Sequence, residues 1–369
     1  MQRRTFLAGA AVLPLLVAGC QTQPADLTVH LLEGSIPLRL LQDFRQRQGD
    51  RRVDFEAAPT LSSLYERLLS WQQDSSPRPA DWATLGDYWL TGAIQQQLIQ
   101  PIPAETWASW QSLDPFWRQL VTRDQAGQPS DGDGAIWGIP YRWGSLMMIY
   151  RSNDWRGYEW RPRTWADLLR AVESPLPGRI ALPNQPRIVT AIALQLLGVP
   201  VNTGDLAGVA DLEATLVALQ QQARFYSSDH YLEPLLLEDV SLAVGWSTDI
   251  LPLLQDYRQF EAVVPETGTL LSADVWVRPA AAPKISPLAQ AWVDYCLDPA
   301  VVSELTIFSQ GSSPRLWGQP VPQELAGQSL LTLTPEIQGR SEILLPLDSQ
   351  GEAQLRELWA RIPELAASL

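Results

Sequence analysis

An acidic residue interrupts an apolar stretch late in the chain. The segment "LLSADVWVRPAAAP", residues 270–283, predicts a buried strand that contains Asp274. A buried carboxylate without a partner costs several kcal/mol, so its charge must be compensated. Either a donor from the protein or the cation of a bound ligand would do this, and both alternatives stay open from the residues alone.

Aromatic residues are frequent, with 16 tryptophans. Most are expected in the core, because aromatic side chains bury large areas. Trp143 and Trp246 differ, since they lie where the chain is expected to cross between two halves or where a strand ends. Aromatic faces beside a carboxylate suit an organic cation. These residues therefore indicate binding of a small cationic molecule.

Motifs for catalysis are absent from the sequence, including G-x-S-x-G, H-E-x-x-H and the P-loop. His30 and His230 are predicted to be structural or solvated. Asp131 and Asp133 in "SDGDGAIWG" alternate as in a calcium loop, but the twelve-residue count ends at Arg142, where glutamate is required. That segment predicts a polar hairpin turn. We expect that the protein is not an enzyme and that it binds neither a cofactor nor a metal ion.

Strands and helices alternate in the first part of the chain. Strands are predicted at 26–32, 51–57 and 81–85, and helices between them at 35–49 and 60–73. This βαβαβ order is typical of a parallel sheet. Ligands bind beyond the carboxyl ends of such strands, which here means the turns that contain Ser35, Asp87 and Tyr88.

The stretch "IWGIPYRWGSLMMIYR", residues 136–151, predicts a crossing into a second lobe. A length of 369 residues also favours two units. Lobe 1 is expected to comprise 26–140 and 275–319, and lobe 2 to comprise 141–274 and 320–369. Further elements are expected as helices at 164–172, 187–198, 286–305 and 351–369. Strands are expected at 178–184, at 240–250 with a turn at Trp246-Ser247, and at 270–279.

The N-terminus has the pattern of an export signal. Residues 1–19 combine Arg3 and Arg4 with an apolar stretch too short to span a bilayer comfortably. The end of the stretch, Val17-Ala18-Gly19-Cys20, resembles a bacterial lipobox, which implies lipid on Cys20 and a tether over 20–25. The arginine pair also resembles a twin-arginine signal, and export by that route or by the general one stays open.

Charge and cysteine content narrow the partners. Residues 1–19 contain two arginines and no acidic residue, so their removal changes the formal net charge from −14 to −16. A chain with this negative charge is not expected to bind nucleic acid. Cys296 shares an apolar helical stripe with Ala289, Trp292 and Val293, which predicts a buried core residue.

Three segments resemble bacterial solute-binding proteins of ABC importers, and among them the spermidine/putrescine-binding group. They are "IPYRWGSLMMIYR", "SLAVGWSTD" and the stretch 263–305 that begins "VVPETGTLLSADVW". The resemblance implies an α/β fold with two lobes joined by crossover strands and a ligand cleft between them. It also implies a monomer at the periplasmic or outer face of the membrane that binds a small molecule and an ABC permease.

The resemblance implies ligand contacts at Trp246, Asp274 and Tyr88, beside Asp87. Other family positions depart from the pattern: the tryptophan before the acid is Ser272, the first-strand aromatic pair falls on Leu32 and Ser35, and two further carboxylates fall near Gln185 and Ile188.

The expected ligand is a small organic cation related to polyamines. Arg142 beside Trp143 leaves an amino-acid-like zwitterion as an alternative. Two alternatives belong to other functional classes. One is an envelope lipoprotein that binds a protein partner, and the other is an enzyme of unrecognised type.

Overall fold

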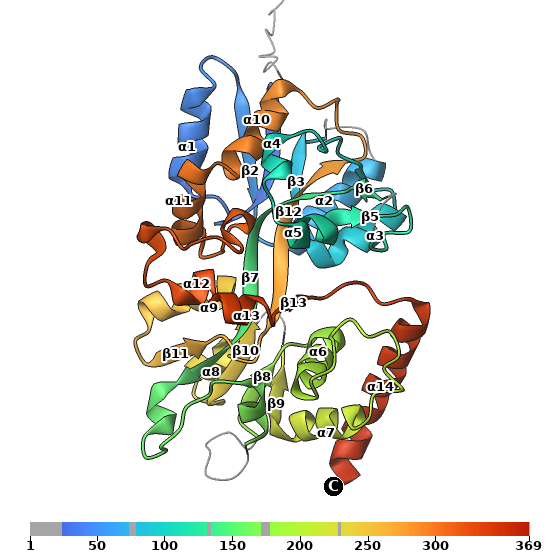
Figure 1. Cartoon of the computed structure of the whole chain (residues 1–369), viewed down its shortest axis with the longest axis vertical. Helices are drawn as coiled ribbons and strands as arrows, with labels where there is room; N and C mark the ends of the chain where they lie inside the picture. Colours follow the sequence, from blue (N-terminus) through green and yellow to red (C-terminus); the bar gives the residue numbers. More distant parts are fainter. Residues whose placement is uncertain (1–23, 74–78, 131–133, 171–177, 228–229, 369) are drawn as a thin grey trace, which may run out of the picture.

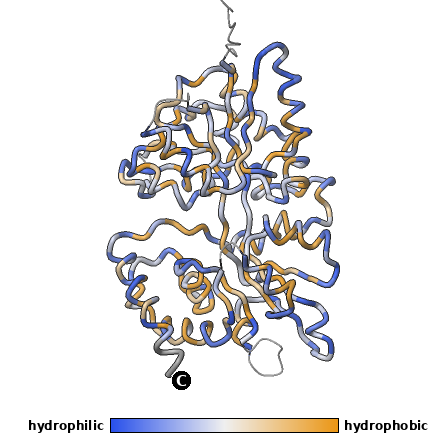
Figure 2. The backbone as a smooth tube through the Cα atoms, turned by 180° about the vertical axis from the view of Figure 1, so that it is seen from behind, coloured by the Kyte–Doolittle hydropathy of each residue, from blue (hydrophilic) through white to orange (hydrophobic). Residues whose placement is uncertain are grey.

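The computed structural model describes residues 24–73, 79–130, 134–170, 178–227 and 230–368. The chain forms two bodies, one above the other in Figure 1, with two long strands running between them. Seen from behind, hydrophobic and hydrophilic residues alternate along most helices (Figure 2), as expected for elements that cover a core on one side. The expectation of a two-lobed α/β fold is confirmed.

The upper body contains the predicted βαβαβ unit. β1 pairs in parallel with both β2 and β3, and the strand and helix positions agree with the sequence prediction to within three residues. The elements are β1 (Leu27–Leu32), α1 (Leu38–Arg47), β2 (Val53–Ala58), α2 (Leu61–Gln73), β3 (Trp82–Gly86), the 3-10 helix η1 (Asp87–Trp89), α3 (Leu90–Gln95), β4 (Ile99–Gln100), α4 (Ala108–Gln111), α5 (Pro115–Val121), β5 (Thr122–Arg123) and β6 (Ala135–Ile136).

Two antiparallel strands cross between the bodies, β7 (Ile139–Arg151) and β12 (Leu270–Pro279). All 13 residues of β7 are buried, because both faces of the strand pack against other elements. Met147 and Ile149 enter one hydrophobic core, whereas Leu146 and Met148 enter the other. Successive side chains of β7 point to opposite faces of the strand, so this one strand contributes to both hydrophobic cores.

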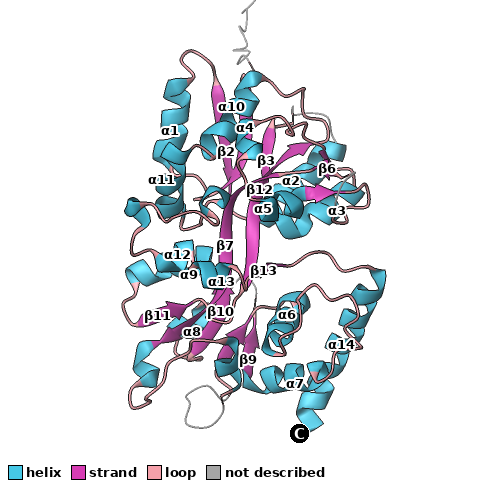
Figure 3. Ribbon diagram, viewed as in Figure 1, coloured by secondary structure: helices cyan, strands magenta, loops and turns pink. Residues whose placement is uncertain are grey.

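The lower body follows β7 along the chain, and helices flank its strands on both sides (Figure 3). Its elements are η2 (Ser152–Trp155), η3 (Trp165–Leu169), β8 (Ile180–Leu182), α6 (Pro186–Leu196), α7 (Leu212–Gln222), β9 (Ala223–Tyr226), α8 (Glu233–Leu236), β10 (Leu242–Trp246), α9 (Ser247–Asp256) and β11 (Phe260–Val263). The described part of the helix expected over 164–172 is the short 3-10 turn η3.

After β12 the chain returns to the upper body and then descends again. Residues 286–305, expected as one helix, form two, because Asp298 caps a new helix that starts with Pro299. These elements are α10 (Pro287–Cys296), α11 (Pro299–Ser309), η4 (Pro314–Leu316), η5 (Gln323–Leu325), α12 (Ser329–Thr332), α13 (Pro335–Gln338), β13 (Glu342–Ile343) and α14 (Ser349–Ser368).

The main sheet has the strand order β2-β1-β3-β12-β7-β10-β8-β9 and therefore continues through both bodies. A register shift interrupts the β7–β12 ladder, where Asp274 faces Arg142 but Val275 faces Pro140. The predicted lobe boundaries, 140/141 and 274/275, fall at this bulge. They stay a prediction, because both strands run on through it.

Several sequence predictions concern other positions. Cys296 is buried, as expected. His30 is buried beside Glu56, 3.2 Å away, and His230 is exposed beside Glu233. The signal peptide with Cys20 and the acidic turn at 131–133 lie outside the described residues. None of the helices in the described part of the chain combines the length and hydropathy of a transmembrane span.

Candidate functional site

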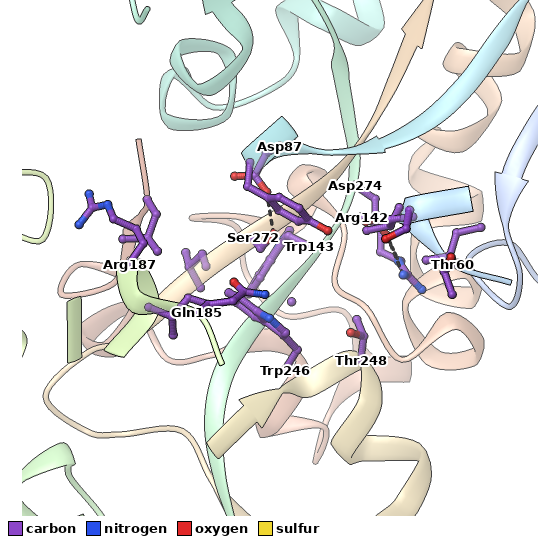
Figure 4. Close-up of a pocket in the computed structure, with 18 of the residues that line it drawn as sticks. Thr60, Asp87, Arg142, Trp143, Gln185, Arg187, Trp246, Thr248, Ser272 and Asp274 are labelled. Atoms are coloured by element: carbon purple, nitrogen blue, oxygen red, sulfur yellow. Dashed lines mark hydrogen bonds and ion pairs between the residues drawn. The ribbon is translucent and has the colours of Figure 1, made fainter. Parts of the chain in front are cut away.

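A cavity of about 1130 Å³ opens between the two bodies. The upper body lines it with the turns after β1, β2 and β3, and the lower body lines it with the first turns of α6 and α9 and with α14. The crossing strands form its inner wall (Figure 4). The cavity lies beyond the carboxyl ends of the parallel strands, where the sequence predicted a ligand site.

Asp87 begins η1 and lies in the wall of the cavity. Its Oδ1 accepts hydrogen bonds from the Ser272 hydroxyl at 2.6 Å and from the backbone N–H of Ala273 at 2.9 Å. Burial raises the pKa of the Asp87 carboxyl to about 6, although both hydrogen bonds and Arg123 oppose this shift. Asp87 is thus an ionisable group that the protein keeps at the cavity at a cost in desolvation.

Asp274 has a partner within the protein. The Nε and Nη2 atoms of Arg142 both bond to Oδ2 of Asp274, at 2.7 and 2.6 Å. Burial by itself lowers the pKa of Arg142, but the Asp274 carboxylate offsets burial and leaves this pKa raised. The sequence left two ways to compensate the charge of Asp274, a donor from the protein or a ligand cation. The structure contains the donor from the protein, which is Arg142. A ligand contact at Asp274 stays a prediction.

The lower body presents an aromatic residue and an acid at the junction of β10 and α9. Trp246 is half-buried at this junction, and its backbone N–H donates to the Tyr231 hydroxyl at 3.2 Å. That hydroxyl donates in turn to Oδ2 of Asp249 at 2.6 Å. Asp249 lies in the first turn of α9, where the helix dipole stabilises a negative charge.

Tyr88 is an exposed aromatic residue of the upper wall, with 53% of its surface accessible. Its ring lies over the backbone of Gly86, where an added Cβ would be 2.6 Å from Cε1 of the tyrosine. The Trp89 ring packs against the Tyr88 ring, and the two ring centroids are 5.1 Å apart. Gly86 therefore leaves room for an aromatic surface that faces the cavity.

The far end of the cavity is lined by cationic and amide side chains. Gln185 precedes α6, and Arg187 lies in its first turn. The Arg187 guanidinium donates to uncharged oxygens, namely Val201 O, Asn202 Oδ1 and Leu345 O. Burial lowers the pKa of Arg187 to about 10. Glu352 of α14 also lines the cavity and acts on Arg187, so this end carries both a cationic and an acidic side chain.

The segment 83–329 matches the family model of the bacterial extracellular solute-binding proteins. It contains both crossing strands and most of the cavity wall. The chain belongs to this family.

Curated relatives and solved structures agree with the match. The putrescine/cadaverine-binding protein of Pseudomonas aeruginosa is 25% identical over 62% of this chain and 67% of its own length. The putrescine-binding periplasmic protein PotF of Escherichia coli is 25% identical over 57% of this chain and 58% of its own length. The spermidine/putrescine substrate-binding protein PotD of Streptococcus pneumoniae has the same fold, with a TM-score of 0.76 at 18% identity over 92% of this chain and 99% of that one.

Six of the seven ligand contacts predicted for this solute-binding protein line the cavity: Asp87, Tyr88, Gln185, Trp246, Ser272 and Asp274. Ser35 does not, because its side chain is fully buried behind the first turn. Trp143 reaches the cavity wall, but its ring stacks on Trp117 at 5.7 Å and belongs mainly to the core.

Asp249 and Arg187 line the cavity of this solute-binding protein but were not among the predicted contacts. Asp249 follows Trp246 by three residues in "GWSTD", just after the turn where the strand was expected to end. This position could have identified Asp249 as a candidate ligand contact. Arg187 had no comparable signal, since an arginine near the start of a helix is common.

Proposed function

We propose that this protein is the substrate-binding component of an ABC importer and takes a small organic cation into the cleft between its lobes. The acidic wall supports this proposal most directly. Asp87 from the upper body and Asp249 from the lower body face the same cavity, near the aromatic rings of Tyr88 and Trp246. Carboxylates attract an ammonium group, and aromatic faces stabilise its charge and its alkyl chain.

The names of the curated relatives support the same ligand class, because both relatives are named for binding putrescine or cadaverine. The protein would work without catalysis. Closure of the lobes would bury the ligand and create the surface that the membrane permease binds. It would act as a monomer, since one chain supplies both walls of the cavity.

A zwitterionic ligand is the second candidate. Arg187 and Gln185 at the far end of the cavity could hold a carboxylate group, while the ammonium group lies near Asp87 or Asp249. An ω-amino acid has this separation of charges. The choice between the two candidates depends on the charge of one end of the ligand.

Attachment to the membrane is part of the proposal. Lipid on Cys20 would tether the protein to the outer face of the cytoplasmic membrane, close to its permease, after export through the twin-arginine or the general route. Support for this comes from the N-terminal sequence alone.

A melting-temperature screen of the purified protein tests the ligand class. We would compare diamines, monoamines, ω-amino acids, dicarboxylates and sugars at equal concentration. We expect only compounds with an ammonium group to raise the melting temperature, because a ligand at a hundredfold excess over its dissociation constant adds about 2.7 kcal/mol to the stability of the folded state. Stabilisation by dicarboxylates or sugars alone would contradict the proposal, and no stabilisation by any compound would favour a protein partner.

A further inference from the structure

The C-terminal arm, residues 341–368, forms part of the cavity wall. In Figure 1 the linker between its elements β13 and α14 runs along the upper edge of the lower body. The arm lies beyond the segment 83–329 that matches the family model. Its residues in the wall are Leu344, Leu345, Pro346, Leu347, Ser349, Glu352 and Arg356. The shape of the cavity therefore depends on how the lower body holds this arm in place.

The side chain of Asn202 pairs with the backbone of the linker. Its Nδ2 donates to the backbone oxygen of Ile343 at 2.9 Å, and its Oδ1 accepts from the backbone N–H of Leu345 at 2.8 Å. The side-chain amide offers the same donor and acceptor as a peptide group, so it binds the linker as a neighbouring strand would. Asn202 follows α6 and is not among the residues that line the cavity.

Arg187 joins this contact from the first turn of α6. Its Nη2 donates to Oδ1 of Asn202 at 3.1 Å and to the backbone oxygen of Leu345 at 3.4 Å. Its Nη1 donates to the backbone oxygen of Val201 at 2.8 Å. Arg187 also lines the cavity. The guanidinium and the linker therefore share Asn202 as a partner, and loss of this side chain would affect the position of both.

The loop that carries Asn202 also holds α14. The backbone N–H of Leu206 donates to Oε1 of Gln354 at 2.8 Å. Nε2 of Gln354 donates in turn to Oδ1 of Asp205 at 3.1 Å. One loop thus binds both the linker and the helix of the C-terminal arm, and Asn202 is its contact nearest to the wall segment 344–347.

We propose that Asn202 is a positioning residue of the ligand site. It fixes the linker 343–347 and the Arg187 guanidinium at the far end of the cleft without touching the ligand. This inference rests on the proposed function, since it concerns the cleft in which the ligand is held.

Titration calorimetry of Asn202→Ala tests this inference. The probes are butylamine, 1,4-diaminobutane and 4-aminobutyrate, and the comparison uses the one that the wild type binds most tightly. We expect the variant to bind it about three- to thirtyfold more weakly, the range for residues that act on a site without contacting its ligand. Hydrogen exchange should also become faster at 343–347, because the Leu345 N–H loses its acceptor.

Two further variants control this result. Asn153→Ala makes the same chemical change at an exposed position outside the cavity wall, and should leave affinity and exchange unchanged. Asn202→Asp keeps the oxygen that accepts from Leu345 and Arg187 but loses the donor to Ile343. Its affinity should lie between those of the wild type and Asn202→Ala, and it is the test variant if the alanine variant does not fold.

Wild-type affinity in the folded Asn202 variants would overturn the inference alone, since Asn202 would then contribute only to stability. An equal loss of affinity in Asn153→Ala, or unchanged exchange at 343–347 in Asn202→Ala, would overturn it too. Absence of amine binding in a folded wild type would instead overturn the proposed function.

Discussion

At the scale of single residues, Asp87 is the acid whose environment most favours a role in ligand binding. Burial raises its pKa to about 6, yet asparagine at this position could accept the same two hydrogen bonds through its amide oxygen. We predict that Asp87→Asn weakens cation binding by about 1.5–3 kcal/mol, the range for a hydrogen bond to a charged group. The free energy of unfolding of the empty protein should stay equal or rise at pH 7. Calorimetry and chemical denaturation of the same samples measure both quantities.

The raised pKa of Asp87 also predicts a pH dependence. The carboxyl holds its proton up to about pH 6 in the folded protein but only to about its ordinary value of 3.8 in the unfolded chain. Its contribution to the stability of the empty protein therefore falls as pH rises from about 4 to about 6. Cation affinity should change in the opposite direction and decline as pH falls through 6. The same titrations with Asp87→Asn provide the control, and an equally steep decline in that variant would assign the effect to another group.

If only a ligand cation compensated Asp274, the empty protein would tolerate asparagine at this position. The structure favours the other alternative, because the replacement would leave the buried Arg142 guanidinium without its carboxylate. We now predict that Asp274→Asn lowers the free energy of unfolding by about 3 kcal/mol. Denaturant unfolding measures this value. A loss of less than about 1 kcal/mol would mean that water, and not the aspartate, compensates Arg142.

At the scale of elements, the junction of β10 and α9 depends on close packing at Gly245. A Cβ added there would be 1.9 Å from Cε2 of Tyr231, whose hydroxyl bonds to Asp249. Gly245→Ala should lower the free energy of unfolding by about 1–3 kcal/mol and weaken ligand binding, since it displaces the tyrosine. Gly204→Ala is the matched control, because nothing lies within 4 Å of its added Cβ. Equal effects of both changes on unfolding and binding would refute this explanation.

The elements that could be predicted are those with local signals. The three strands of the upper body have apolar alternation and turn residues at their ends, and α14 has a clear apolar stripe. α7 and β9 were missed, although Pro200, Gly204 and Gly208 lie before the start of α7. The pairing of Arg142 with Asp274 could not be predicted, because 132 positions separate the two residues and the bulge that brings them face to face is a property of the packed sheet. Ser35 was placed at the cleft from its turn position, but its side chain points into the core.

At the scale of the whole molecule, the position of the cavity between two bodies predicts a change of shape. Ligand contacts to both walls favour a closed arrangement over an open one. Small-angle X-ray scattering should therefore show a smaller radius of gyration after addition of a ligand that raises the melting temperature. An unchanged radius at saturating ligand would mean that the lobes bind without closing.

The proposed membrane attachment depends on Cys20, which precedes the described residues. Stable membrane attachment requires two or more lipid chains, and a lipidated N-terminal cysteine supplies them. We predict that Cys20→Ala moves the protein from the membrane fraction to the soluble fraction of its host. Immunoblots of both fractions measure this. Wild-type protein found wholly in the soluble fraction would remove the claim of lipidation.

The identity of a retained ligand tests the central claim most directly, namely that the cleft takes an organic cation. Native mass spectrometry of the protein isolated from its host, followed by fragmentation of any adduct, would identify this ligand. We predict a small compound with at least one protonated amine, bound one to one and released by Asp87→Asn. An adduct without a basic nitrogen, or protein that stays free of adducts after incubation with the amine series, would contradict the account.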